Sequence, residues 1–123
     1  MADKRCLKKE ILLSDQFLNM PPKTCVLYII LNYMADDDGF VSSPKVVLRS
    51  CRCNATDLRR LLEEGYIYRF PSGVLLIRHW FLHNTIKPDR YHPTMHTEEI
   101  SQVEKDRFKV YQMKKRGSPD NDT

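Results

Sequence analysis

The chain has 123 residues, of which 41% are hydrophobic and 29% are charged, and its formal net charge is +4. This length suits one domain with one modest core. No stretch approaches the roughly 18 consecutive apolar residues of a membrane-spanning helix, and the charged start MADKRCLKKE is unlike a signal peptide. We therefore expect a cytoplasmic protein without a membrane partner. Its four cysteines, Cys6, Cys25, Cys51 and Cys53, are then expected to be free thiols.

Positive charge is concentrated in the middle of the chain. Residues 40–97 contain nine Lys and Arg residues against four acidic residues, which leaves a local excess of +5. The excess over the whole chain is too small to identify a partner, so its distribution is more informative. The nine basic residues are Lys45, Arg49, Arg52, Arg59, Arg60, Arg69, Arg78, Lys87 and Arg90.

The first third of the chain predicts a central helix. Residues 1–13 form a basic arm that ends in apolar residues, which suit either a short strand or the start of a helix. Ser14 or Asp15 is suited to cap a short helical turn. Apolar residues then recur at helical spacing, which predicts a core helix over 23–34 with Pro22 favourable at its start. The repeating positions are Leu27, Ile30, Leu31 and Met34.

Three acidic residues, Asp36 to Asp38, precede Gly39 and resemble the start of a calcium loop. An EF-hand loop needs alternating oxygen ligands, a glycine at its sixth position and a glutamate at its twelfth. That framework is missing here. We interpret 36–39 as a solvated turn that leads into a short strand at 40–41.

Two short helices follow, joined by a tight turn. Ser42 or Ser43 is suited to cap the first, Pro44 to occupy its first position, and the helix is predicted to end near Cys51. Asn54 is the predicted N-cap of the second helix, over 54–64, and its leucines fall on one side. Two helices joined by so few residues predict a helix-turn-helix.

A β-hairpin is predicted directly after this second helix. Gly65 ends the helix, and the segments 66–70 and 74–78 are rich in β-branched and aromatic residues. Residues 70–73 read Phe-Pro-Ser-Gly, with proline placed for the second position of a turn. The order helix, strand, helix, turn, helix and hairpin predicts an α+β fold. Its predicted type is a winged helix-turn-helix with a three-helix core and a hairpin wing.

The remainder of the chain is expected to extend this domain. We place the winged-helix domain at 1–97, including the basic arm and an irregular, basic and aromatic loop over 86–94. Such a loop could track a phosphate backbone or stack on unpaired bases, but we expect Trp80 and Tyr91 to pin it over the core and its cations to stay available. An additional C-terminal helix is predicted over 98–113, because Glu98 and Glu99 suit a first turn and apolar residues follow in a partial stripe. Residues 114–123 are polar and are expected to be a flexible tail.

Candidate DNA-binding residues follow from this arrangement. Exposed arginines of a recognition helix can fork onto guanine or onto phosphate, and the wing tip offers small groups and a backbone N–H. The alternative is that Arg59 and Arg60 simply pair with Glu63 or Glu64 on a solvated face, and that the hairpin charges protect a sheet edge. The candidates are Lys45, Asn54, Thr56, Arg59, Arg60, Arg69, Ser72, Arg78, Lys87 and Arg90.

Metal and catalytic sites have weaker signals. His79 and His83, His92 and His96, and the Cys51-x-Cys53 pair raise a zinc hypothesis. A strand before His79, Pro93 inside the second pair and the Cys-x-Cys spacing favour packing or hydrogen-bonding histidines instead. No glycine-rich phosphate loop, HExxH or nucleophile elbow is present. We therefore expect a non-enzymatic protein without a cofactor.

Several strings resemble a known family. ADDDGFVSSPK at 35–45 and GYIYRFPSGVLLIRHWFLHNTIKPDRYHPT at 65–94 are similar to the N-terminal winged-helix domain of replisome organiser proteins. These proteins come from phages and mobile elements of low-GC Gram-positive bacteria and are related to DnaD-type replication initiation proteins. The similarity covers roughly residues 3–113. Longer relatives carry a further helical domain behind this one.

The resemblance implies DNA binding during replication initiation in the cytoplasm of a bacterial host cell, with a helicase or its loader as a further partner. It supplies no base-contacting residue, so the candidate residues rest on their chemistry. Two alternatives stay open. One is a protein-interaction or self-assembly module that forms a homo-oligomer, and the other is a transcriptional repressor, since fold does not imply function.

Overall fold

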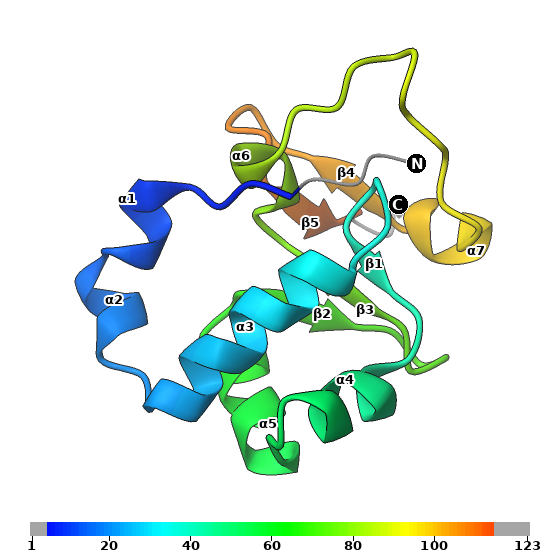
Figure 1. Ribbon diagram of the computed structural model, residues 1–123. Helices are drawn as coiled ribbons and strands as arrows, with labels where there is room; N and C mark the ends of the chain where they lie inside the picture. Colours follow the sequence, from blue (N-terminus) through cyan, green and yellow to red (C-terminus); the bar gives the residue numbers. More distant parts are fainter. Residues whose placement is uncertain (1–4, 115–123) are drawn as a thin grey trace.

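The computed structural model describes residues 5–114, and within them helices and short strands alternate along the chain (Figure 1). This confirms the α+β class. The helices are α1 Lys9–Leu12, α2 Asp15–Leu18, α3 Pro22–Met34, α4 Pro44–Ser50, α5 Ala55–Glu63, α6 Trp80–His83 and α7 Thr97–Ile100. The strands are β1 Phe40–Val41, β2 Ile67–Arg69, β3 Leu75–Ile77, β4 Val103–Lys105 and β5 Tyr111–Met113.

Helix α3 is the central element, as predicted. Pro22 occupies its first turn, where a missing N–H costs nothing, and Leu27, Tyr28 and Leu31 are buried along one face. Helices α4 and α5 both contact α3, and Figure 1 shows them together at one end of the molecule. Helix α3 therefore packs against both helices of the α4–α5 pair.

The start of helix α5 is set by hydrogen bonds of the Asn54 and Asp57 side chains. The Asn54 side chain accepts hydrogen bonds from the backbone N–H groups of Thr56 and Asp57, and the Asp57 carboxylate accepts one from the Asn54 N–H. This reciprocal capping box satisfies donors that an isolated helix start would leave unpaired. Leu58 and Leu61 are buried against the core. The predicted helix over 54–64 is confirmed.

The predicted hairpin is also confirmed, and it forms most of a three-stranded antiparallel sheet. The strand order is β1-β3-β2, with Arg69 opposite Leu75 and Phe40 opposite Leu76. The central strand β3 has a strand on each side, and its residues Leu75, Leu76 and Ile77 are fully buried. The Gly73 N–H donates to the Phe70 carbonyl at 2.8 Å and closes the turn.

The segment after the hairpin contains a short helix that the sequence did not predict. Trp80 opens α6, is fully buried and donates its indole N–H to the Asp37 carbonyl at 2.9 Å. Gly39 lies so close to this indole that a Cβ at residue 39 would be 2.7 Å from Trp80 Cγ. The predicted anchoring role of Trp80 is confirmed.

The predicted C-terminal helix over 98–113 is wrong. Helix α7 ends at Ile100, and β4 and β5 then form an antiparallel hairpin that pairs Val103 with Met113. The Asp106 carboxylate accepts the N–H groups of Phe108 and Val110, which favours a turn over a continuing helix. Tyr111 is buried and donates its hydroxyl to the Asp38 carbonyl. The predicted flexible tail lies, except for residue 114, outside the described residues.

The prediction of a solvated turn at Asp36–Asp38 is wrong in its solvation, although β1 does follow. Asp37 and Asp38 are 1% and 4% exposed. The Asp38 carboxylate accepts from the Tyr91 hydroxyl and from the Thr94 N–H, which pins segment 84–96 to the turn. Arg5 pairs with Asp37 at 3.2 Å. Asp37 and Asp38 therefore connect the turn to the N-terminal arm and to segment 84–96, respectively.

The N-terminal arm lies along α6. The Cys6 N–H donates to the Asn84 side chain at 2.8 Å, and the Lys8 N–H donates to His83 Nδ1 at 2.6 Å. Helix α1 then forms in place of a strand, and Ser14 caps α2 as predicted. None of the helices within residues 5–114 has the length and apolar content that crossing a bilayer requires.

Candidate nucleic-acid interface

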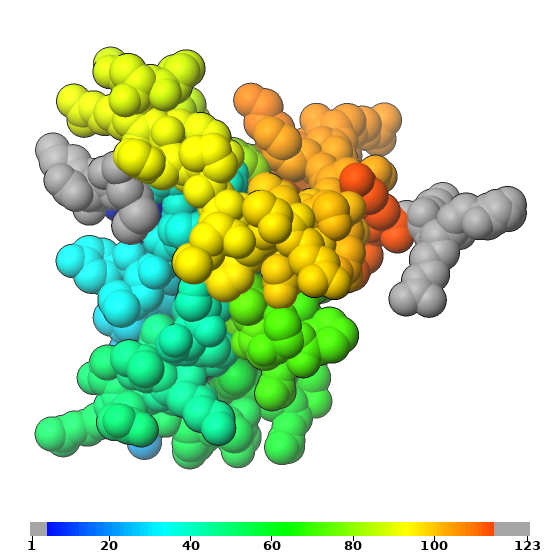
Figure 2. Space-filling model, turned by 90° about the vertical axis from the view of Figure 1, so that its right-hand side faces the viewer, coloured from blue at the N-terminus to red at the C-terminus, as the bar shows by residue number. Residues whose placement is uncertain are grey.

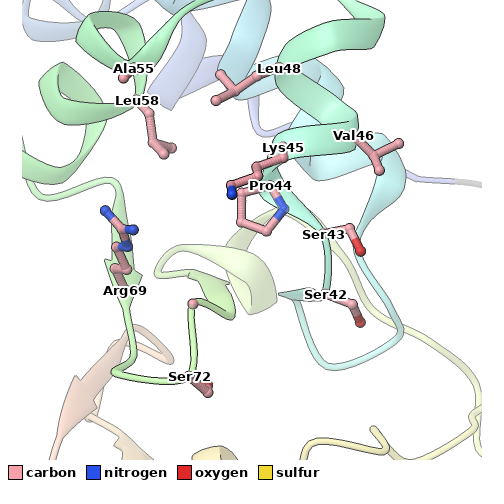
Figure 3. Close-up of a pocket in the computed structure, with 11 residues that line it drawn as sticks. Ser42, Ser43, Pro44, Lys45, Val46, Leu48, Ala55, Leu58, Arg69 and Ser72 are labelled. Atoms are coloured by element: carbon pink, nitrogen blue, oxygen red, sulfur yellow. The ribbon is translucent and has the colours of Figure 1, made fainter.

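Three of the predicted residues meet at one hollow between α4, α5 and the hairpin turn. Lys45, Arg69 and Ser72 all line it, together with Ala55 and Leu58 of α5 (Figure 3). The hollow has a volume of about 480 Å³. In Figure 3, Lys45 and Arg69 point into it from opposite sides. Residues that are far apart in sequence therefore contribute two cations to one depression.

Arg59 lies on the solvent side of α5 beside this hollow. It follows Ala55 by one helical turn, so the two residues share a face, and it is exposed. Thr56 is exposed as well. Arg60 instead pairs with Glu64 at 3.1 Å, four residues along the helix. Arg60 thus follows the alternative interpretation of a charge pair on the helix surface.

Asn54 serves the helix start, because its side-chain oxygen is already engaged by two backbone N–H groups. Arg52 precedes it in the turn between α4 and α5 and adopts a left-handed backbone, with φ of 58°. The Cys53 N–H donates to the Leu48 carbonyl and the Arg52 N–H to the Arg49 carbonyl. This is a Schellman motif, whose left-handed position usually carries glycine. A basic residue stands there at a conformational cost.

Ser72 lies at the hairpin turn and is exposed. Its hydroxyl donates to the Glu99 carboxylate at 2.6 Å, so the turn is joined to α7. This hydrogen bond holds the pKa of Glu99 below its usual range. A phosphate at the turn would have to share or replace this contact.

Arg78 is not placed with the other predicted cations. It follows β3 at the open end of the hairpin, while Arg69 adjoins the turn. Its guanidinium donates to the carbonyls of Tyr111 and Gly65 at 3.2 and 3.3 Å and lies over the Tyr68 ring. Arg78 joins the two sheets, and its prediction as a phosphate contact has no geometric support.

Lys87 and Arg90 are exposed but lie away from the hollow. Both belong to segment 84–96, which Figure 1 shows at the end of the molecule opposite α4 and α5. Figure 2 shows this segment in yellow, near the orange β4–β5 hairpin. The Tyr91 hydroxyl donates to the Asp38 carboxylate. Desolvation of this hydroxyl raises its pKa to about 12, and the hydrogen bond and charge of Asp38 add to the shift.

The buried histidine His83 makes hydrogen bonds through both of its ring nitrogens. His83 Nδ1 accepts from the Lys8 N–H, so the neutral ring carries its proton on Nε2 and donates to the Tyr28 hydroxyl at 2.6 Å. Burial lowers the pKa of His83 to about 4, and His79 adds to this shift. Within residues 5–114, no group of three or more His, Cys, Asp or Glu side chains is arranged to hold a metal ion. The four cysteines are free.

One exposed group of side chains was not predicted from the sequence, and it lies at the turn of the β4–β5 hairpin. Arg107, Phe108 and Lys109 are all exposed there. The prediction of a helix over 98–113 did not place these three residues together, because consecutive residues of a helix point in different directions around its axis. The sequence Asp106-Arg107-Phe108-Lys109 between two segments containing valine was the available turn signal.

Comparisons of the chain with protein-family models, with curated proteins and with solved structures find no match. The resemblance to replisome organiser proteins therefore stays a prediction. The candidate interface rests on the geometry of the described residues alone.

Proposed function

We propose that this chain is a non-enzymatic module that binds duplex DNA as a winged helix-turn-helix. Helix α5 acts as the recognition helix and the β2–β3 hairpin as the wing. One observation carries the proposal: Lys45 of α4 and Arg69 of β2 point into one hollow beside α5. Neither residue has an ion pair within residues 5–114.

Two cations on separate elements, spaced across a depression, suit a chain of phosphates better than a single small anion. Phosphate contacts fix the register of a protein on DNA, and base edges supply specificity. Lys45 and Arg69 would take the first role. Arg59, exposed on α5, would supply the second, because an arginine can bond guanine O6 and N7 together.

The narrower role in phage or mobile-element replication is supported by the sequence resemblance. In that role the module would bring DNA to a helicase or its loader. Under this proposal α5 and the β2–β3 hairpin would face the DNA, and the replication partner would bind elsewhere on the module.

A mobility-shift titration against salt tests the proposal. Each phosphate contact contributes about 0.9 to the slope of log binding constant against log salt. The double variant Lys45→Ala/Arg69→Ala should therefore lower the slope for duplex DNA by about 2. Specific, random and single-stranded DNA are compared in the same series, since sequence preference separates base contacts from phosphate contacts.

A matched control removes the same charge elsewhere. The double variant Lys8→Ala/Lys9→Ala lies on the N-terminal arm, where both side chains are exposed, and it should leave the slope unchanged. Absence of binding to duplex DNA at low salt contradicts the proposal. So does an equal loss of slope in both double variants, because charge alone would then explain binding.

Self-assembly is a second candidate, which one observation favours. The solvent side of α3 carries Val26, Ile29 and Tyr33, which are 45%, 38% and 66% exposed and lie on one face. The only charged residue of α3 is Lys23. Light scattering on the wild type and on Tyr33→Ser tests this candidate: concentration-dependent association that the substitution abolishes supports it, and a strict monomer at high concentration excludes it.

A further inference from the structure

The β4–β5 hairpin presents an exposed aromatic ring between two cations. Arg107, Phe108 and Lys109 occupy its turn, and Phe108 is 62% exposed. Figure 1 shows this turn at the end of the molecule opposite α4 and α5. The group is therefore separate from the hollow between α4, α5 and the β2–β3 turn.

The turn has a fixed backbone. The Asp106 carboxylate accepts the Phe108 N–H at 2.8 Å and the Val110 N–H at 3.1 Å, and the Lys109 N–H donates to the Asp106 carbonyl at 2.9 Å. Lys109 is held in the left-handed region, with φ of 63°. A residue with a Cβ adopts this region only where its surroundings impose it. The backbone therefore sets the direction in which each of the three side chains leaves the turn.

The strand ends next to this turn, Lys105 and Tyr111, are attached to the rest of the fold. Lys105 Nζ lies 4.2 Å from the centroid of the Phe81 ring, and Tyr111 is buried. The Tyr111 N–H donates to the Arg78 carbonyl at 3.0 Å, which links β5 to the residue after β3. A hairpin that is anchored directly beside its turn, with an apolar ring exposed at that turn, is suited to hold a flat ligand.

We propose that this turn binds an unpaired nucleotide of single-stranded nucleic acid. The base stacks on the accessible part of the Phe108 ring, and the flanking phosphates are bound by Arg107 and Lys109. Arg107 already lies over this ring, with Cζ 4.9 Å from its centroid. Aromatic rings beside basic residues are the usual means of binding single strands without sequence preference, because every base has a stacking face.

The surroundings of Phe108 favour a nucleotide over a protein partner. A contiguous exposed apolar patch marks many protein-docking surfaces, whereas the sequence neighbours of Phe108 in this turn are both cationic. Met113 is the other large apolar side chain exposed on the hairpin within the described residues. It pairs with Val103 at the opposite end of the ladder, so it does not extend the apolar surface at the turn.

The test measures the affinity of the chain for an oligothymidylate of about ten nucleotides, a probe with little structure of its own. Stacking on one aromatic ring contributes about 1–3 kcal/mol by alanine substitution, so Phe108→Ala should raise the dissociation constant by about 5- to 150-fold. Phe108→Trp should bind the oligothymidylate about as tightly as the wild type, because tryptophan also offers a ring for stacking. It also provides a fluorophore that bound DNA quenches, whereas Trp80 is fully buried.

Two controls separate this site from the proposed duplex site. Met113→Ala removes an exposed apolar side chain from the same hairpin and should leave oligothymidylate binding unchanged. The double variant Arg59→Ala/Arg69→Ala should weaken duplex binding and spare the oligothymidylate. If duplex binding is absent but Phe108→Ala still reduces oligothymidylate binding, the inference holds and the proposed function alone is lost.

The inference is overturned if the wild type does not bind oligothymidylate at low salt. It is equally overturned if Phe108→Ala binds as tightly as the wild type, or if Phe108→Trp binds as weakly as Phe108→Ala. In the last case the ring itself does not stack on a base, and a protein partner becomes the better occupant of the turn.

Discussion

The two ends of the molecule were built by different kinds of interaction. At the end formed by α4, α5 and the β2–β3 turn, neighbouring residues in sequence determine the structure, as the Asn54–Asp57 capping box shows. At the other end, residues 84–114 are organised by contacts across long sequence separations. Asp38, for example, accepts from Thr94, 56 residues away. Local signals identify the first kind of structure and miss the second.

Substitution of Gly39 should have the largest effect, because this residue couples the acidic turn to the core. A Cβ at residue 39 would be 2.7 Å from Trp80 Cγ, and its φ of +92° already disfavours any other residue. We expect Gly39→Ala to cost about 4 kcal/mol of unfolding free energy, the range of severe core overpacking with backbone strain. Urea denaturation measures this.

Gly73 is the matched control in the other region. It has nearly the same φ, +91°, but no atom lies within 4 Å of its added Cβ. Gly73→Ala should therefore cost only the left-handed backbone term of about 1 kcal/mol. Equal losses in the two variants would show that the Trp80 contact adds nothing, and the coupling would be disproved.

Asp38→Ala should release the segment that carries Lys87 and Arg90. It removes the acceptor for the Tyr91 hydroxyl and for the buried Thr94 N–H. A buried donor without a partner costs about 1–3 kcal/mol, and the Thr94 N–H becomes such a donor, whereas Tyr91 is exposed enough for water to reach it, so we expect a loss of about 1–3 kcal/mol. Hydrogen exchange should show faster exchange at Thr94 and unchanged protection in α5. Asp89→Ala, exposed in the same segment, should stay within about 0.5 kcal/mol of the wild type.

The same division explains which features could be predicted from the sequence. Helix α5, the β2–β3 hairpin and α3 could be predicted, because capping residues, a Pro-Ser-Gly turn and helical spacing lie within each element. The solvation of Asp37 could not, because its partner Arg5 is 32 residues away. Helix α6 is one turn long, too short to show a period. Residues 98–113 have both helical and alternating apolar positions, and the Tyr111–Asp38 contact favours the hairpin.

In the candidate site, Lys45, Arg69 and Ser72 could be identified as polar residues on the correct elements. Their meeting at one hollow could not, because it depends on how the hairpin turn lies against α4. The partners of Arg78 could not be predicted either. Arg78 lies directly after β3, and the carbonyls of Gly65 and Tyr111 that accept from its guanidinium come from outside the hairpin.

Acid should weaken the attachment of the N-terminal arm through His83. The unfolded histidine titrates near 6.5, whereas burial lowers the folded pKa to about 4. Between these values the unfolded chain binds the extra proton, so stability is full above about pH 6.5 and falls as the pH falls towards 4. We expect a loss of about 2 kcal/mol across this window, since each pKa unit is worth 1.36 kcal/mol and solvent screening reduces the full value.

Thermal unfolding of the wild type and of His83→Gln from pH 7 to pH 4 measures this loss. The glutamine variant is less stable at pH 7 but lacks the titrating ring. Its stability should therefore depend less on pH in this window. Parallel pH curves for the two proteins would mean that another group, such as His79, whose pKa is also lowered by burial, controls the acid response.

Arg52→Gly should have the smallest effect on stability, and of the opposite sign. Glycine adopts the left-handed conformation at φ 58° without the penalty that arginine pays, so the variant should gain about 0.5–1 kcal/mol. Arg52 is exposed in the turn between α4 and α5, the two helices whose residues line the hollow. If duplex DNA approaches this surface, the same substitution weakens binding while it stabilises the fold. Arg52→Asn, which tolerates the backbone but lacks the charge, should reproduce the loss of binding, whereas unchanged affinity in both variants would exclude Arg52 from the interface.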